Sequence, residues 1–497
     1  MTHRRSSSSG WGYNTRNVVG TRPIYEDSVP WAMTLGLADM HWHQTGVDQR
    51  DGVTLITGTF RAFGHPFPVA GNGVKTLPWR QVAMLFLPEH PGGSPTPYGV
   101  LYNCHDMLEA DAKTHLALGR RVCQAFRIPV MIHGWAPDVV SELEGTTYHS
   151  TQASWMRLLL ASGVERAEDL PDDLRFVSPL PKGDMVAISL LQRLALREAG
   201  LNVDEVGSLG ISKEGGAHWI LGAIDDRVTV VAPGGCIPST RDLMACYRED
   251  WNFELPPEFG EPDLFHTFWR YLDWAHRTEA GRALNQPMEV AYWPDAIKAR
   301  DVLISGDLGL PGQHDRAWPV LAERQFFDTF SHSSWHYVRA FDGSGLLLGD
   351  RIGEMGIGLL YHVAYLLTNG TRTPSTPTVT VTESGRRLRI EARSRTSGDH
   401  EAEALLFTMI SSSRNRRLPG TVWQRTPMPE AHGEPGCYAS PLLPSAPLGH
   451  SLTFIVAVRE RVEQGGTWYW RSASTLPEER FPLPRCDGRL PRWDEDT

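Results

Sequence analysis

The feature that most constrains the fold is an alternation of short apolar runs and amphipathic helical segments in the middle of the chain. A strand-like run, 98-YGVLYN-103, precedes a helix-like segment at 110–126, and the strand-like run 128-IPVMIHG-134 follows. Strands joined through helices need crossover connections, which place the strands in parallel and the helices on the faces of the sheet. The sequence therefore predicts an α/β fold with a mostly parallel sheet flanked by helices.

The pattern continues through the next 240 residues or so, again in alternation. The helix at 185–199 is expected to start at Asp184 as its N-cap and to end at Gly200. Two apolar segments earlier in the chain, 53–63 and 82–88, predict an antiparallel opening to the sheet. The further elements expected are strands at 205–210, 228–233, 301–305 and 335–341 and helices at 215–224 and 353–370.

The chain divides into three regions by composition. Residues 1–25 are polar and rich in Ser and Arg, which predicts a flexible tail, and residues 26–372 carry the α/β pattern. Two long connections, about 137–181 and 236–300, are expected to form lid segments over one end of the sheet. From 373 to 497, short alternating segments between turn residues predict an antiparallel β-sandwich of the immunoglobulin or fibronectin kind.

Charge and cysteine usage exclude several classes of protein. The net charge is −10 over 497 residues without a long basic block, so no nucleic-acid partner is expected. The six cysteines form no Cys-x-x-Cys pair, which argues against a disulfide framework and a thiolate zinc site. No apolar run of about 18 residues and no secretory leader is present, so we expect a cytoplasmic protein without membrane contact. A small-molecule substrate is expected, no cofactor or metal is predicted, and a homo-oligomer is left open.

Ser212 stands at the turn in 205-EVGSLGISKEGG-216, between a predicted strand and a predicted helix. A serine nucleophile needs a base for its proton and donors for the oxyanion. A sharp strand-to-helix turn lifts the hydroxyl above the sheet and directs the next amide, that of Lys213, at the developing charge. The Gly-Ile-Ser-Lys-Glu-Gly spacing is one residue longer than Gly-x-Ser-x-Gly. The turn therefore indicates Ser212 as a nucleophile and Lys213 as an oxyanion donor.

The residues GISKEG, the following AIDDRVTVVAP and 418-LPGTVWQRTP-427 resemble the PhoPQ-activated pathogenicity-related family. The glucuronoyl esterases, with a Gly-x-Ser-Arg-x-Gly turn, are similar at greater distance. The resemblance covers roughly residues 80 to 475 in the order of the elements. It implies an α/β-hydrolase core with an appended β-domain.

The resemblance also implies an acid and a histidine that this chain does not have at the matching positions. The acid is expected after the strand at 301–305, where the matching position is Gly309 and Asp307 stands nearby. The histidine is expected after the strand at 335–341, where the residue is Gly345. The catalytic triad is therefore predicted to be degenerate.

Other ionisable groups are expected at the same end of the sheet. Asn103, Cys104 and His105 follow the strand at 98–103, at the position of the oxyanion loop, and His133 follows the next strand. Because the carboxyl ends of parallel strands surround the site, His105 or His133 is a candidate base and Asn103 and Cys104 are candidate binding groups. The alternative for either histidine is a hydrogen-bonded residue at the edge of the sheet.

Three functions remain open at this stage. The first is acyl chemistry, meaning hydrolysis or transfer of an ester, thioester or lactone, with Ser212 as nucleophile. The second keeps the fold for elimination, cyclisation or rearrangement, with His105, His133 or Asp307 as general acid or base. The third is a non-catalytic binding protein.

Overall fold

The structure is a computed structural model, and it describes most of the chain between Ser28 and Arg480. The described residues are 28–69, 73–89, 97–106, 109–135, 141–143, 146–148, 160, 163–169, 179–211, 213–234, 262–285, 289, 296–306, 335–339, 354–370, 374–398, 401–411, 423–431, 433–447 and 449–480. The predicted tail at 1–25 lies outside these residues.

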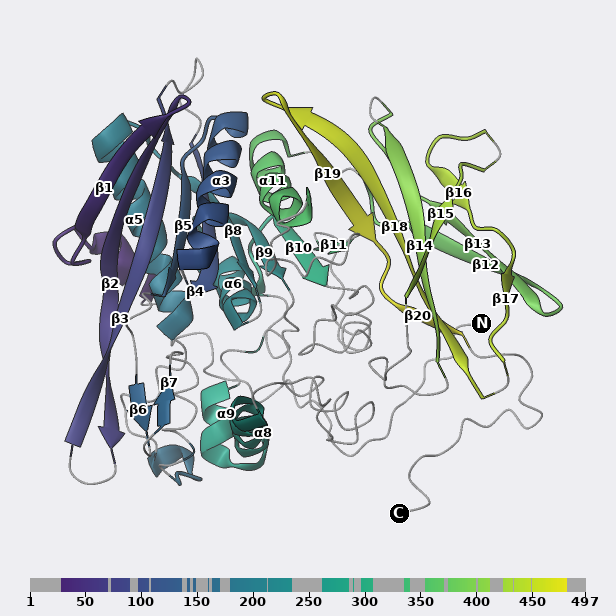
Figure 1. The fold of residues 1–497 in the computed structure, drawn as a ribbon. Coiled ribbons are helices and arrows are strands. Elements are labelled where there is room, and N and C mark those ends of the chain that lie inside the picture. Colours follow the sequence, from purple (N-terminus) through teal and green to yellow (C-terminus); the bar gives the residue numbers. More distant parts are fainter. Residues whose placement is uncertain are drawn as a thin grey trace.

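A nine-stranded mixed sheet forms the centre of the α/β part, in the order β1-β2-β3-β5-β4-β8-β9-β10-β11 (Figure 1). Its strands are β1 (His43–Arg50), β2 (Val53–Val69), β3 (Gly73–Pro88), β4 (Tyr98–Asp106), β5 (Val130–Trp135), β8 (Glu205–Ile211), β9 (Val228–Gly234), β10 (Asp301–Gly306) and β11 (Trp335–Arg339). The strands from β1 to β3 pair antiparallel, as does β3 with β5, and all later neighbours pair in parallel. The predicted parallel sheet with an antiparallel opening is confirmed.

Helices cover both faces of this sheet. The first face carries α2 (Ser28–Thr34), α5 (Pro179–Ala199) and α6 (Lys213–Ile224), whose apolar residues share one core with the sheet. The second face carries α3 (Glu109–Phe126) and α11 (Glu354–Asn369), which share a second core. Strands buried on both faces read as continuous apolar runs, which explains the sequence of β9.

The predicted lid segments contribute short elements that contact one another. The first contains β6 (Ser141–Leu143), β7 (Thr146–Tyr148) and the 3₁₀ turn η2 (Ala167–Asp169), and the second contains α8 (Pro262–Arg277) and α9 (Glu279–Asn285). Ala280 N donates to Glu165 O at 2.9 Å, and Trp274 Nε1 donates to Val164 O at 2.7 Å. Figure 1 shows these elements grouped below the large sheet.

Two further antiparallel sheets form the C-terminal part. The first joins β12 (Thr378–Ser384), β13 (Arg387–Arg393), β16 (Cys437–Ala439) and β17 (Leu443–Pro444), and the second joins β14 (Ala402–Ser411), β15 (Gln424–Met428), β18 (Ser451–Gln464), β19 (Thr467–Ser474) and β20 (Glu478–Arg480). Apolar residues of both sheets, such as Ile390 and Phe454, share one core. We call this part, residues 374–480, the β-domain.

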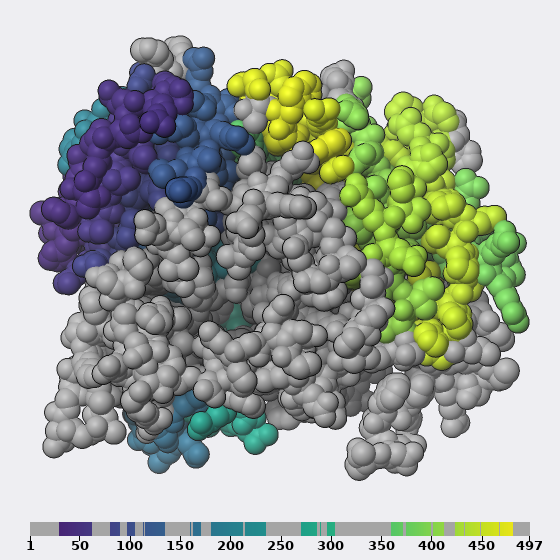
Figure 2. Space-filling view, viewed as in Figure 1, coloured from purple at the N-terminus to yellow at the C-terminus, as the bar shows by residue number. Residues whose placement is uncertain are grey.

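The β-domain contacts the α/β part through the β18–β19 hairpin. The Tyr469 ring lies 4.7 Å from the Tyr361 ring of α11, and the Arg471 guanidinium lies 4.1 Å from the Tyr365 ring. Arg471 is also paired with Glu460 at 3.0 Å, and both side chains are buried. Figure 2 shows the C-terminal strands, in green and yellow, along one side of the molecule and the N-terminal strands along the other.

Candidate functional site

Position 212 is the single residue between a buried strand and a helix. β8 ends at Ile211, and α6 begins at Lys213, two residues earlier than the sequence predicted. Ser212 itself and the side chain of Lys213 lie outside the described residues. Because the first amides of a helix have no partner within it, the start of α6 presents N–H donors next to position 212. We call residues 210–214 the elbow.

The elbow lies at the point in the sheet from which successive strands are added toward opposite edges. From β4 the chain passes through α3 to β5, and from β8 it passes through α6 to β9 on the other side. α3 and α6 pack on opposite faces, so the two crossovers separate between β4 and β8. In open α/β sheets, ligands bind outside the carboxyl ends of the strands at such a switch point.

Three of the predicted site residues belong to β4, which continues to Asp106 instead of ending at residue 103. Asn103 pairs with Gly210 of β8, so the end of β4 lies beside the elbow. Cys104 is buried in the core under α3 and α11, and its role as a binding group stays a prediction. It points away from Asn103 because successive residues of a strand face opposite sides. His105 lies in β4 by its backbone, and its side chain is outside the described residues.

His133 does not follow a strand, as the sequence predicted, because it lies within β5 and is fully buried. Its Nδ1 is hydrogen-bonded to Gln81 Oε1 at 2.8 Å, and its Nε2 lies 3.1 Å from Asp184 Oδ1. The ring is thus enclosed in the sheet and held on both sides. The sequence alternative, a hydrogen-bonded histidine, describes it better than a base at the rim.

Asp184 is not the N-cap of α5, because the helix begins five residues earlier at Pro179. Proline fits the first turn of a helix, where its missing N–H would have no partner. Asp184 therefore stands inside the helix with its carboxylate buried against the sheet. Its Oδ1 accepts a hydrogen bond of 2.8 Å from Asn103 Nδ2, and its Oδ2 lies 3.7 Å from His218 Nε2.

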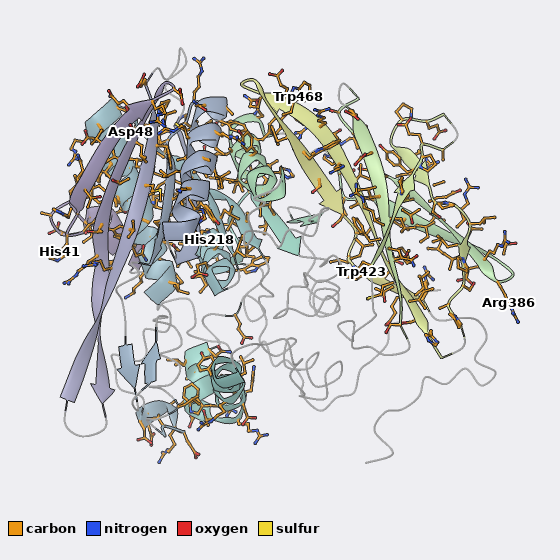
Figure 3. The ribbon with its side chains drawn as sticks, in the orientation of Figure 1. His41, Asp48, His218, Arg386, Trp423 and Trp468 are labelled. Atoms are coloured by element: carbon orange, nitrogen blue, oxygen red, sulfur yellow. The ribbon has the colours of Figure 1, made fainter. Side chains whose placement is uncertain are left out.

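His218 completes this buried group from α6, and Figure 3 labels it at the centre of the α/β part. Its Nδ1 is hydrogen-bonded to Ser208 Oγ of β8. Burial lowers the pKa of His218 from 6.5 to about 4, because the imidazolium loses its solvation, and the nearby Asp184 carboxylate offsets only part of this. The neutral ring has one N–H, and pointing Nε2–H at Asp184 leaves Nδ1 to accept from the Ser208 hydroxyl.

We call these residues the Asp184 cluster: Gln81, Asn103, His133, Asp184, Ser208 and His218. Each has at most 2% of its surface exposed, so the cluster is buried between the sheet and the helices α5 and α6. It touches the elbow through Gly210. A Cβ added to Gly210 would stand 2.3 Å from His218 Cδ2 and 2.6 Å from His218 Nε2, so the imidazole lies directly against the backbone.

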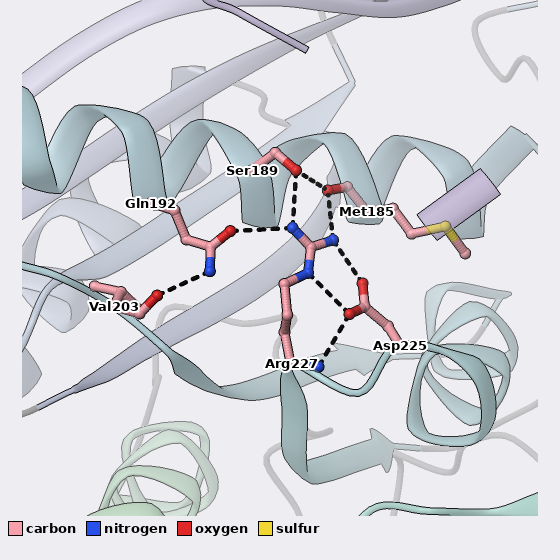
Figure 4. A network of polar contacts seen from close by, with 6 residues as sticks. All are labelled: Met185, Ser189, Gln192, Val203, Asp225 and Arg227. Atoms are coloured by element: carbon pink, nitrogen blue, oxygen red, sulfur yellow. Dashed lines mark hydrogen bonds and ion pairs between the residues drawn. The ribbon is translucent and has the colours of Figure 1, made fainter. Parts of the chain in front are cut away.

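A second polar network fixes α5 to the loop between α6 and β9 (Figure 4). Arg227 donates twice to Asp225, from Nε at 2.9 Å and from Nη2 at 2.7 Å. It also reaches three groups of α5: Ser189 Oγ at 2.8 Å, Gln192 Oε1 at 3.1 Å and Met185 O at 3.2 Å. Since Met185 follows Asp184, this clamp holds the part of α5 that carries the buried carboxylate.

Asp307, Gly309 and Gly345 lie outside the described residues, as does Ser212. Sequence reasoning missed His218 and Ser208 and gave Asp184 the wrong role. One signal was present in the sequence: Asp184 precedes the apolar run 185-MVAISLL-191, and His218 lies in the apolar run 217-AHWILGAI-224. A lone ionisable residue on the buried face of a helix requires a partner.

Two general properties complete the description of the site. Within the part of the chain that the structure describes, no group of three or more His, Cys, Asp or Glu residues is arranged to hold a metal ion. In that same part, every helix is too short or too polar to cross a membrane.

No family model matches the chain, and no curated protein matches it. The solved structures that match include esterases and hydrolases. They include an S-formylglutathione hydrolase from Agrobacterium tumefaciens, with 12% identity over 65% of this chain and 95% of that one and a TM-score of 0.36. An acetyl xylan esterase from Paenibacillus sp. R4 has 12% identity over 64% and 87% of the two chains and a TM-score of 0.33.

A glucuronoyl esterase of carbohydrate esterase family 15 from Caldicellulosiruptor kristjansonii matches at 13% identity, over 68% of this chain and 81% of that one, with a TM-score of 0.32. At these TM-scores the matches do not carry an activity over to this chain. The resemblance to the PhoPQ-activated pathogenicity-related family stays a prediction.

Proposed function

We propose that the protein is an α/β-hydrolase-fold enzyme that hydrolyses or transfers the acyl group of an ester, thioester or lactone, with Ser212 as its nucleophile. The observation that carries the proposal is the place of residue 212. It is the only residue between buried β8 and α6, and it lies at the switch point between β4 and β8. A strand-to-helix turn at the carboxyl edge of a sheet is where such folds carry an exposed nucleophile, which supports the proposal.

In the proposed reaction the Ser212 oxygen attacks the acyl carbon and its proton passes to a base. The leaving alcohol, thiol or ring oxygen takes that proton as its bond to the acyl carbon breaks. Water or an acceptor alcohol then releases the acyl group from Ser212 by the same steps. The amide of Lys213 and donors at the end of β4 near Asn103 would stabilise the oxyanion.

His105 is the residue we propose as the base. The pairing of Asn103 with Gly210 puts residue 105 of β4 and residue 212 after β8 each two positions beyond the same pair. The two other histidines near the elbow are held elsewhere, His133 by Gln81 and Asp184 and His218 by Ser208. His105, at the end of the strand beside the elbow, is therefore the histidine that we propose.

A substrate panel of aryl esters, thioesters and lactones tests this function with three proteins. Ser212→Ala should lower kcat about a thousandfold or more, since it removes the nucleophile, and His105→Ala should lower kcat about a hundredfold. Ser445→Ala, in the β-domain, is the control and should keep full activity. Turnover that survives in Ser212→Ala and is lost in His105→Ala would replace acyl chemistry by acid–base chemistry at the same edge.

A further inference from the structure

We propose that Asp184 is a positioning residue for the elbow, acting through Asn103 of β4 and His218 of α6. This inference rests on the proposed function for its effect on catalysis, but the positioning itself is a property of the fold. The carboxylate stands between the two elements that flank the switch point. It accepts from Asn103 at 2.8 Å and faces His218 Nε2 at 3.7 Å.

Two of the three contacts of Asp184, those with Asn103 and His218, lead to the elbow by a short path, and the third is with His133 of β5. Asn103 pairs with Gly210, two residues before Ser212. His218 lies against the Cα of the same glycine and is bonded to Ser208, two residues earlier in β8. The strand end and the helix start are therefore fixed relative to one another by one carboxylate and one imidazole.

Structural stability alone does not account for a carboxylate at this position. Burying a charged group costs several kcal/mol unless its partners compensate for lost hydration, and apolar residues in its place are often as stable or more so. α5 is already attached by the Arg227 clamp and by its apolar face. The Asp184 carboxylate adds a fixed acceptor for the Asn103 amide of β4 and lies close to the imidazoles of β5 and α6, which favours one geometry of these elements.

Both contacts require a carboxylate at position 184, because each of its two oxygens can accept a hydrogen bond. With an amide at position 184, one of the two terminal atoms becomes an NH₂ donor and meets the N–H of either Asn103 or His218. One of the two contacts is then lost while the size of the side chain is unchanged. A shift of about 1 Å at a nucleophile can cost about a hundredfold in rate, so a small displacement of the elbow is sufficient to be measured.

The test compares the full-length protein with Asp184→Asn, Ser208→Ala and a matched control, Glu460→Gln. Glu460 is also a fully buried, ion-paired carboxylate, but it lies in the β-domain. The first measurement is amide hydrogen exchange by mass spectrometry, which does not depend on any activity. Peptides covering residues 205–218 should exchange about tenfold faster in Asp184→Asn, and to a smaller extent in Ser208→Ala, while Glu460→Gln leaves them unchanged.

The second measurement is the rate of fluorophosphonate labelling at Ser212, together with kcat and KM for an ester. We expect labelling and kcat to fall about ten- to a hundredfold in Asp184→Asn with KM little changed, because the nucleophile is displaced and the binding surface is not. If Asp184→Asn does not fold, Ser208→Ala decides the test. Unchanged exchange at 205–218 in the folded variant overturns the positioning role. Failure to label the wild-type protein overturns the proposed function and leaves the exchange result to decide the positioning role separately.

Discussion

Gly210 and His218 are in direct contact: the imidazole occupies the space where any other residue at position 210 would place its Cβ. The contact joins the end of strand β8 to the first turns of helix α6, on either side of Ser212. It explains why a glycine stands at a position whose backbone is otherwise ordinary strand.

Gly210→Ala should destabilise the protein by about 1–3 kcal/mol, because the added methyl group overlaps an imidazole that is held by Ser208 and cannot move freely. Urea unfolding measures the change. Gly36→Ala is the control, since the added Cβ meets only the exposed Asp39 carboxylate at 3.3 Å, and its effect should stay below about 1 kcal/mol. Equal effects of the two substitutions would contradict the close contact.

The stability of the protein should fall as the pH decreases from about 6.5 to about 4, in part through His218. Its pKa is about 4 in the folded state and 6.5 as a model value, so between these values the unfolded chain binds a proton that the folded protein does not. At about 1.4 kcal/mol per pKa unit, the contribution lost is about 3 kcal/mol.

Other groups titrate in the same range, so the quantity to measure is the difference between wild type and His218→Gln in the free energy of unfolding, followed from pH 7 to pH 4. The wild type should lose stability more steeply than the variant in this range. Parallel curves would show that His218 is not neutral and buried.

The Arg227 clamp should carry a large share of the stability of the α/β part. Arg227→Met leaves the buried Asp225 carboxylate without its partner, which predicts a loss of about 3–5 kcal/mol. Lys298→Met is the control, because the ion pair of Lys298 with Asp226 is exposed and worth about 0–1 kcal/mol. Chemical unfolding of both variants separates the two cases, and a small effect of Arg227→Met would contradict the clamp.

The β-domain should unfold together with the α/β part. Tyr469 of β19 belongs to the core formed by α3 and α11, so Tyr469→Ala is expected to cost about 3–5 kcal/mol and to lower the melting temperature of the whole protein. The adjacent Trp468 is 57% exposed, and Trp468→Ala should have little effect. Calorimetry that resolves two separate transitions, with only one moved by Tyr469→Ala, would disprove the shared core.

Much of the fold follows from local periodicity. The apolar run before Ser212 and the run after Arg227 predicted β8 and β9 to within one residue at either end, and Gly200 ends α5 with a positive φ of 66°, as its sequence context indicates. Helix starts were less accurate. α5 begins before Asp184 because proline at position 179 can start a helix, and the polar residue that looked like a cap is buried instead.

The site was less predictable because its contacts join residues far apart in the chain. Asp184 meets Asn103 across 81 positions of sequence, and no spacing rule connects them. His133 was expected after its strand but lies within β5, where its partner Gln81 comes from β3, 52 positions away in the sequence. The elbow could be predicted because strand, turn and helix are contiguous there, whereas the cluster beneath it depends on tertiary packing.

The most direct test of the central claim is to treat the protein with a fluorophosphonate and map the modified residue by mass spectrometry, with Ser212→Ala as the matched control. The account predicts one phosphonylated site, at Ser212, formed in the native protein, absent from Ser212→Ala and lost on unfolding. A native protein that remains unmodified at Ser212, or that is modified equally in the Ser212→Ala variant, would contradict it.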